Sequence, residues 1–474
     1  MRALALVAAM AMAGSRAGAG QAASRLPPEL KQFVAVDAPV VALKNVKVID
    51  GTGADPRSGQ TVVLTGNKIT AVGPSESTPV PAGAKVLDLA GSTVIPGIVG
   101  MHDHTFYTTA AGRRTQLGFT APRLYLGSGV TTIRTTGSIS PYAEITLKGQ
   151  IERGEVIGPR MHISGPYITG PDPVLERKHI TTPEEARRVI DYWAEEGATW
   201  FKVYTLITRE NLKAVTDAAH KRGLKVTGHL CSVGYREAVA AGIDGLEHAL
   251  GANLEYVPGK QPDKCPQMDM AVYAKLDLNG EAVQATFRDL IEHHVPMTST
   301  LAVFELSYPN RPPLDQRMLD AMSPDVRSEY LTSRSRIAEN AATSTWPAVF
   351  RKAMDYEVAF VKAGGTLAAG VDPTGNGGAL PGFGDQRNFE LLIEAGFTAP
   401  QAIQIMSANG AKVLGLGASL GTVEAGKTAD LVVINGDPAT TASDIRKVTI
   451  VFKDGVGYDS PKLIDSVKGL VGVR

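Results

Sequence analysis

Two histidines separated by one residue are the first sign of chemistry in this sequence. His102 and His104 flank Asp103 and follow an apolar run that ends at Met101. In a β-strand the side chains alternate between two faces, so both imidazoles point to the same side. Neutral imidazoles bind metal ions, and a pair on one face predicts a metal chelate. Such a pair also occurs by chance, so this interpretation depends on the other strands.

Four more polar residues stand where other apolar runs end, namely Lys202, His229, His248 and Asp372. A charged, unpaired lysine inside the run Trp200–Tyr204 would be costly, so we expect Lys202 to be neutral, paired or modified. Taken one at a time, these residues are typical of an edge lysine, two core histidines and a turn cap. Together with the histidine pair, they predict a metal site at the ends of several strands.

The elements that must position these residues are short apolar runs separated by amphipathic stretches. One such stretch, Pro183–Ile190, follows Thr181 and Thr182, which suit a helix N-cap. Eight strands alternating with helices predict an α/β fold, a (β/α)8 TIM barrel with its chemistry at the carboxyl ends of the strands. A doubly wound sheet is the alternative, but no GxGxxG follows a strand. The eight runs are 94–99, 129–134, 160–164, 197–204, 225–229, 242–248, 295–301 and 365–371.

Both ends of the chain are rich in β-type runs. Several lie between residues 40 and 94, and the same texture returns at Leu431–Ile434 and Val448–Phe452, before the turn Lys453-Asp454-Gly455. Such spacing predicts a small sheet or sandwich. A length of 474 residues suggests about three average domains, but this pattern reduces the number to two. We expect a β-sandwich domain from residues 35–94 plus 413–474, and a barrel over residues 95–412.

The composition excludes some classes of partner. The chain has 48 basic residues (lysine plus arginine) and 48 acidic residues (aspartate plus glutamate). The net charge is therefore zero, and no long-range positive electrostatic field favours binding to nucleic acid or an anionic membrane. Hydrophobic residues at 43% and charged residues at 20% are typical of a folded globular protein. No apolar run approaches the ~20 residues that span a bilayer, so we expect no membrane span.

Residues 1–24 are typical of an export signal. Met1-Arg2 precedes the apolar run Ala3–Ala13, and small residues follow with an Ala17-Gly18-Ala19 pattern. The alternatives are a misassigned start codon and an alanine-rich helix. We expect an exported protein, periplasmic or secreted.

The chain contains two cysteines, Cys231 and Cys265. They are too few for a disulfide framework and match no zinc spacing. A single bridge would suit an oxidising compartment. We expect two unpaired thiols instead, because Cys231 falls inside a predicted core strand.

The six polar residues together resemble the motif of the metal-dependent amidohydrolase superfamily. That motif has an HxH on strand one, a carboxylated lysine on strand four, histidines on strands five and six, and an aspartate on strand eight. The resemblance covers nearly the whole mature chain, and residues 421–433 look like the segment that returns to the family's β-sandwich. The sequence Lys202-Val203-Tyr204 is similar to the imidazolonepropionase-like branch, which includes Xaa-Pro and Xaa-Arg dipeptidases and ochratoxin-hydrolysing amidases.

This resemblance implies a centre of two divalent metal ions, with Lys202 carboxylated by CO2 and bridging them. A carbamate would also remove the buried positive charge of that lysine. Nitrogen and oxygen ligands without cysteine suit Zn²⁺, with Mn²⁺, Co²⁺ and Fe²⁺ as alternatives. A hydroxide bridging the metals would attack a carbonyl, and Asp372 would pass its proton to the leaving nitrogen. The resemblance assigns one metal to His102, His104 and Asp372, and the other to His229 and His248.

Two residues are candidates for holding the substrate. Tyr204 shares the face of Lys202, and the resemblance implies that it holds an α-carboxylate. Arg134, at the end of the second run, is a second candidate anion clamp. Both favour a small molecule or short peptide, such as a dipeptide, a C-terminal peptide bond or an N-acyl amino acid, cleaved at an amide C–N bond. The alternatives are a lactonase or phosphotriesterase on the same site and a non-catalytic scaffold; assembly into a homo-oligomer is left open.

Some segments depart from that branch. Its glycine-histidine segment after strand three is Thr169–Pro173 here, its strand-eight Gly-Thr-Asp is Gly370-Val371-Asp372, and a usual histidine near the last helix is Asn388. The loops 251–280 and 303–363 are long, and loops at this face of a barrel carry specificity. We expect their aromatic residues either to wall an apolar pocket or to pack the loops onto the barrel: Tyr256, Phe304, Tyr308 and Trp346.

Overall fold

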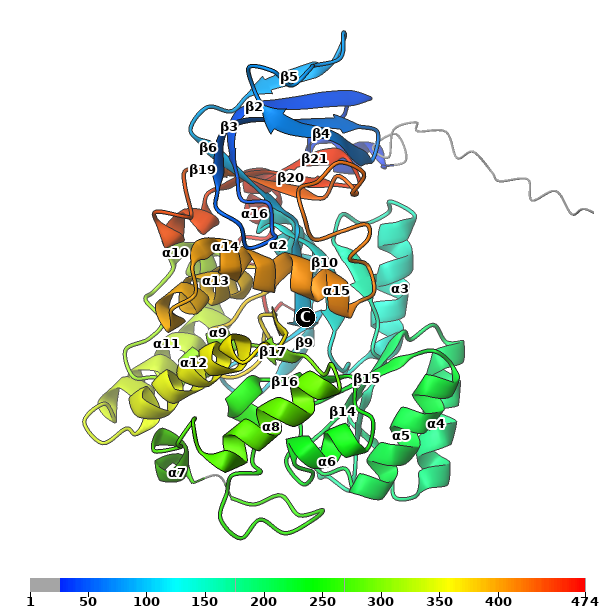
Figure 1. The fold of residues 1–474 in the computed structure, drawn as a ribbon, viewed down its shortest axis with the longest axis vertical. Coiled ribbons are helices and arrows are strands. Elements are labelled where there is room, and N and C mark those ends of the chain that lie inside the picture. The colour runs from blue at the N-terminus through cyan, green and yellow to red at the C-terminus, as the bar shows by residue number, and fades with distance from the viewer. Residues whose placement is uncertain (1–25, 175, 268, 474) are drawn as a thin grey trace, which may run out of the picture.

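The computed structural model describes residues 26–174, 176–267 and 269–473. The export signal predicted at residues 1–24 lies outside them. In Figure 1 the strands from the two ends of the chain, blue and red, lie together at one end of the molecule. Helices surround the parallel strands of the remainder.

The terminal strands form one sheet, in the order β1-β21-β20-β19-β6-β2-β3-β4, with β5 paired to β2. Strand β2 pairs with β5 through residues 41–44 and with β6 through residues 47–48, so the sheet divides at this strand. Apolar side chains from both chain ends form one core here, and the stacking of these strands as a sandwich stays a prediction. The nine strands are β1 (Val34–Val36), β2 (Val40–Val48), β3 (Arg57–Thr65), β4 (Lys68–Pro74), β5 (Lys85–Asp88), β6 (Ser92–Pro96), β19 (Leu431–Asn435), β20 (Val448–Lys453) and β21 (Val456–Asp459).

The parallel strands lie in two sheets, β11-β10-β7 and β13-β12-β14-β15-β16-β17-β18. Backbone hydrogen bonds connect the sheets at two places. Thr199 and Trp200 donate to Ile163 O (2.9 and 3.2 Å), and Asp372 donates to His102 O (2.8 Å). The predicted α/β class is confirmed, and closure into one barrel stays a prediction that these bonds support. The strands are β7 (Ile98–Asp103), β10 (Val130–Thr135), β11 (Arg160–His162), β12 (Tyr167–Thr169), β13 (Lys178–His179), β14 (Trp200–Val203), β15 (Lys225–Gly228), β16 (Gly245–Glu247), β17 (Met297–Ser299) and β18 (Leu367–Ala369), beside a hairpin of β8 (Phe106–Thr108) and β9 (Arg114–Gln116).

The first predicted run, 94–99, belongs to two strands rather than one. Residues 92–96 form β6, which pairs with β19 in the terminal sheet, and the parallel strand β7 begins at Ile98. The break falls at Gly97, whose N–H donates to Asp430 O (2.8 Å) and where a Cβ atom would collide with Thr131. The chain thus passes from one sheet to the other at a residue that has to be glycine.

Helices occupy the stretches between the parallel strands. The predicted helix at 183–190 is α4, and Thr182 caps it by accepting a hydrogen bond from Glu185 N–H (3.2 Å). Among the described residues, no helix combines the length and the apolar character needed to cross a membrane. The helices are α1 (Pro28–Lys31), α2 (Thr120–Gly127), α3 (Pro141–Glu152), α4 (Pro183–Glu195), α5 (Arg209–Lys221), α6 (Tyr235–Ala240), α7 (Met270–Ala274), α8 (Glu281–Glu292), α9 (Leu301–Glu305), α10 (Gln316–Ala321), α11 (Pro324–Glu339), α12 (Trp346–Lys362), α13 (Phe383–Ala395), α14 (Ala399–Gln404), α15 (Gly410–Val413) and α16 (Ser460–Asp465).

The two cysteines are joined, which corrects the prediction of unpaired thiols. Cys231 and Cys265 form a disulfide across 34 residues of sequence. Cys231 lies beyond the end of β15, in a bend, rather than inside the strand. From there it reaches the long loop after β16, so the bridge ties two loops at the same end of the parallel strands.

Candidate metal centre

Three of the predicted ligands meet at the carboxyl ends of β7 and β18. The ligand atoms of His102, His104 and Asp372 all lie within 4.8 Å of one another. His102 Nε2 is 3.6 Å from Asp372 Oδ2, and His104 Nε2 is 3.3 Å from Asp372 Oδ1. These are the three residues that the sequence assigned to one metal ion.

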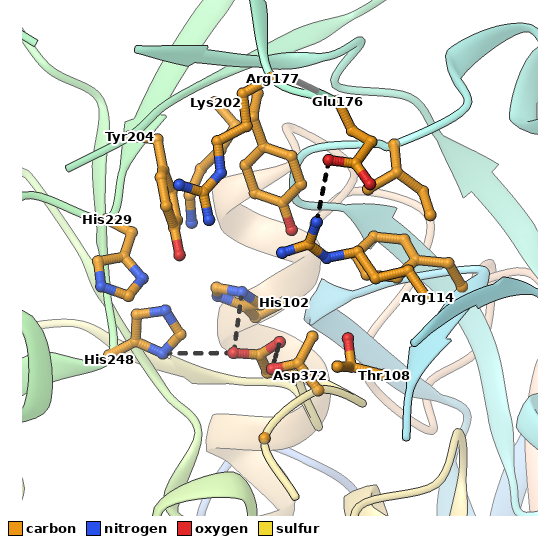
Figure 2. A pocket seen from close by; sticks show the side chains of 15 residues that line it. His102, Thr108, Arg114, Glu176, Arg177, Lys202, Tyr204, His229, His248 and Asp372 are labelled. Atoms are coloured by element: carbon orange, nitrogen blue, oxygen red, sulfur yellow. Dashed lines mark hydrogen bonds and ion pairs between the residues drawn. The ribbon is translucent and has the colours of Figure 1, made fainter. Parts of the chain in front are cut away.

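The other three predicted ligands lie around the same cavity. Lys202 is on β14, His229 follows β15 and His248 follows β16. The ring centroids of His229 and His248 are 4.4 Å apart, as are those of His102 and His248. Figure 2 shows these side chains converging on one space, a cavity of about 230 Å³. Five of the six predicted ligands line it, and the sixth, His104, contacts Asp372.

Hydrogen bonds orient the histidine rings. Nδ1 of His102 donates to Glu247 Oε2 (2.7 Å), and Nδ1 of His104 donates to Gly137 O (3.0 Å). Nδ1 of His248 lies 2.7 Å from Thr300 Oγ1. Each bond uses Nδ1 and directs Nε2 of the ring away from that partner, which is how proteins commonly present histidines to a metal.

Two buried polar nitrogens at the cavity have no partner among the described residues: an imidazole nitrogen can bind a cation directly, and a lysine amine can do so only after losing its charge. Lys202 Nζ and His248 Nε2 are buried and have no hydrogen-bond partner among the residues that the structure describes. Buried polar groups almost always have a partner, so such orphans call for an explanation. A set of nitrogen and oxygen ligand atoms that includes an unpaired imidazole nitrogen suits a divalent metal ion.

The local electrostatics favour the neutral forms of His102 and His229. Burial, and then the charge of Lys202, lowers the pKa of His102 to about 4 and that of His229 to about 3. Burial also lowers the pKa of Lys202 to about 8, against the opposing effect of Glu247 and Asp372. Neutral imidazole is the form that binds metals, and a neutral lysine is the form that reacts as a nucleophile.

The carboxylate of Asp372 stays ionised. Burial alone would raise the pKa of Asp372, but the neighbouring histidines, His102 first, hold that pKa well below its usual range. Asp372 Oδ1 also accepts a hydrogen bond from Thr374 Oγ1 (3.0 Å). An ionised carboxylate beside the histidines could serve as a metal ligand or accept a proton.

Two of these residues have a strained backbone. His248 has φ 69° and Asp372 has φ 47°, in the left-handed region that residues other than glycine rarely adopt. Such conformations cost free energy and cluster at functional sites. His248 directly follows β16 and Asp372 is the third residue after β18, and both side chains line the cavity.

Arg134 has a different place from the one predicted. Its side chain is 1% exposed, and it is not among the described residues that line the cavity. Its guanidinium donates to Glu247 Oε1 (2.5 Å) and lies over the ring of Trp200 (4.6 Å). The role of substrate clamp is therefore corrected: Arg134 is beneath the site, where it neutralises the carboxylate that orients His102.

The cavity wall includes residues that were not predicted from the sequence. Tyr204 lines the cavity as predicted, but so do Tyr167, Arg114, Glu176 and Arg177. Tyr167 Oη lies 3.3 Å from His104 Nε2. Glu176 and Arg177 form a charged pair shortly after residues 169–173, the segment that differs from the branch, and this position could have indicated them. No spacing in the sequence indicates Arg114.

The aromatic residues of the long loops mostly pack those loops. Phe304 contacts His248 (5.5 Å between ring centroids). Trp346 donates its indole N–H to Phe304 O (2.9 Å), and Tyr256 pairs with the Tyr356 hydroxyl (3.1 Å). None of Tyr256, Phe304, Tyr308 and Trp346 is among the described residues lining the cavity.

Known proteins share this architecture. The chain is 26% identical over 200 residues to an enamidase from Eubacterium barkeri, a match that covers 40% of this chain and 49% of that protein. The chain thus spans about half the length of this curated relative. Among solved structures, a Xaa-Pro dipeptidase with bound methionine has a TM-score of 0.66 at 22% identity, covering 89% of this chain and all of that one. A bottromycin amidohydrolase has a TM-score of 0.68 at 19% identity, covering 94% and 95%.

The fold of these neighbours agrees with the branch that the sequence resembles. The amidohydrolase family itself matches residues 93–457, from β6 into β21. That range includes all six predicted ligands and most of the described residues. The chain belongs to the amidohydrolase family.

Proposed function

We propose that this protein is a metal-dependent amidohydrolase that cleaves the amide C–N bond of a small substrate: a dipeptide, a C-terminal peptide bond or an N-acyl amino acid. One observation carries the proposal. A buried lysine, without a hydrogen-bond partner in the described part of the chain, faces the same cavity as three histidines and an aspartate. A cavity of about 230 Å³ suits a small substrate.

The residues that would hold two divalent ions, in our proposal two zinc ions, follow from the cluster. His102, His104 and Asp372 would hold one, and His229 and His248 the other. Lys202 would join them as a carbamate: its amine nitrogen bonds to the carbon of CO2 and one proton is released. When bound, such ions lower the pKa of water and polarise a substrate carbonyl.

Asp372 is the proposed proton carrier. Its ionised carboxylate takes a proton from the attacking water and delivers it to the leaving nitrogen. The hydrogen bond from Thr374 to Oδ1 orients the carboxylate. Tyr204, at the cavity wall, keeps its hydroxyl proton because burial raises its pKa, so it is a hydrogen-bond donor to the substrate.

We also propose that the protein is exported. The disulfide between Cys231 and Cys265 supports this, because such bonds persist in oxidising compartments.

The test combines metal analysis with a substrate screen. Purified protein is reconstituted with Zn²⁺ and bicarbonate, and we expect about two ions per chain. The His229→Asn variant should lose metal, whereas His293→Asn, at an exposed histidine outside the site, should keep it. Xaa-Pro and Xaa-Arg dipeptides, N-acyl amino acids, lactones and paraoxon are then compared. Well under one ion per chain, or turnover of lactones or paraoxon alone, would refute the proposal.

A further inference from the structure

The loop after β12 provides part of the cavity wall. It connects β12 to β13 and contains the segment in which this chain departs from the dipeptidase-like branch. Arg177 and Glu176 from this loop line the cavity, and Arg114 from β9 lines it from the other side. Figure 2 shows Arg177 beside Tyr204 and Arg114 joined to Glu176.

Two contacts hold the guanidinium of Arg177 in place. Its Nη1 donates to Asp172 Oδ2 (2.5 Å), and its plane lies over the ring of Tyr204 (4.3 Å from the centroid). Asp172 is itself fixed by the Val174 N–H, which donates to Oδ1 (2.7 Å). Burial alone would raise the pKa of Asp172, but these hydrogen bonds hold it below its usual range.

The two arginines differ in how firmly they are held. The Arg177 and Asp172 side chains are 16% and 5% exposed, whereas those of Arg114 and Glu176 are 29% and 49% exposed. A solvated pair such as Arg114–Glu176 (3.2 Å) is weak. Arg177 is therefore the preorganised cation of the cavity. A guanidinium has five N–H donors, and Asp172 accounts for one of them.

Tyr204 relates this cation to the metal centre. One tyrosine ring contacts both the guanidinium of Arg177 and the imidazole of His229, whose centroid is 4.8 Å away. An anion bound to Arg177 would thus be separated from the predicted metal ligand His229 by about the width of the Tyr204 ring. If an amide is cleaved at the metal centre, the α-carboxylate of the residue on the leaving nitrogen is an anion that this spacing accommodates.

We propose that Arg177, positioned by Asp172, binds the free carboxylate of the leaving amino acid and makes the enzyme select acids over C-terminal amides. This inference rests on the proposed function. Arg177 determines specificity, and Asp172 is a positioning residue that acts through it. The planar guanidinium suits a carboxylate because it donates two parallel hydrogen bonds.

The first experiment measures a preference. Metal-loaded full-length protein is assayed with dipeptides and N-acetyl amino acids, each as free acid and as C-terminal amide. Wild type should prefer the acid, and Arg177→Met should reduce the acid-to-amide ratio of kcat/KM by about 10- to 100-fold. Arg177→Lys, which keeps the charge, should lie between them. Asp172→Asn should raise KM for the acid more than it lowers kcat. Arg187→Met, at an exposed arginine of α4 paired with Glu184, is the matched control.

The second experiment measures binding without turnover. The twenty free L-amino acids and their amides are titrated into the loaded protein by calorimetry, and Arg177→Met should lose the preference for the acids. Wild type could cleave neither acids nor amides and still bind the acids more tightly, with this binding preference lost in Arg177→Met. In that case Arg177 binds the carboxylate and the proposed function fails. If the ratio is unchanged, or acids and amides are affected equally in both Arg177 variants, the inference fails while the hydrolase stands. If wild type shows neither cleavage nor binding, both are wrong.

Discussion

The carboxylate of Glu247 lies 2.7 Å from Nδ1 of His102 and holds this ring with Nε2 toward Asp372. The same carboxylate accepts hydrogen bonds from Arg134 and from the Thr227 hydroxyl. The buried ion pair of Arg134 and Glu247 thus lies next to the candidate metal centre. There Glu247, as the hydrogen-bond partner of His102, controls the basicity and the orientation of that imidazole.

Glu247→Gln should weaken metal binding by about 10- to 100-fold, because the amide is a poorer acceptor for His102 and removes the charge. The measurement is competition for Zn²⁺ with a chelator of known affinity. The substitution also leaves Arg134 buried without its counter-charge, which destabilises by about 3–5 kcal/mol. The double variant Glu247→Gln/Arg134→Met removes that charge, and it should show the same loss of affinity. Glu281→Gln, at a side chain that is 81% exposed, is the control. Unchanged affinity in both Glu247 variants would contradict an orienting role.

Metal loading should depend on pH through Lys202. Its amine has a pKa lowered to about 8, so it is protonated below that pH and neutral above it. Only the neutral amine attacks CO2. With dissolved CO2 held constant, the rate of activation by Zn²⁺ should therefore rise about 50-fold between pH 6 and pH 8, following the neutral fraction.

A variant isolates the carbamate from other effects of pH. Lys202→Ala should lose metal and activity, and propionate or a similar short carboxylate should restore part of both, because it can occupy the space with two oxygens. Loading of Lys202→Ala equal to wild type without any carboxylate would show that Lys202 is not a ligand.

Asp372→Asn should keep much of the bound metal but lower kcat by about 10²- to 10⁴-fold, because an amide cannot accept the proton. The substitution is mild for the backbone, since asparagine tolerates the left-handed conformation that Asp372 adopts. Metal content and kcat are measured on the same sample. A kcat near that of wild type would contradict the proton-transfer role.

Replacing both cysteines by serine should lower the free energy of unfolding by about 4 kcal/mol, the chain-entropy value for a loop of 34 residues. Denaturant unfolding gives this difference. A reductant should lower the stability of wild type and leave the double variant unchanged, which separates the bridge from the side-chain substitutions. Equal stability of oxidised wild type and the variant would mean that the two thiols are not joined.

Much of the architecture could be predicted from the order of residues. Short apolar runs alternating with amphipathic stretches identify parallel strands, and the carboxyl ends of such strands meet on one side. Polar residues at several of those ends therefore have to be neighbours, which is why His102, Lys202, His229, His248 and Asp372 could be grouped before any coordinates. The first run is the exception, because hydrophobicity does not reveal that Gly97 passes the chain between two sheets.

The sequence by itself identified the family and the residues predicted to be ligands, since both depend on residue types at the ends of strands whose local pattern is strong. Tertiary structure alone decided which side chains surround those ligands. Arg134 ends a strand and looked like a substrate clamp, yet it is directed below the site because Glu247 neutralises it there. Arg177 is in a loop without a periodic pattern, and only the packing against Asp172 and Tyr204 brings it to the cavity. Loops and bridges such as Cys231–Cys265 depend on distances between remote segments, and no local spacing encodes such distances.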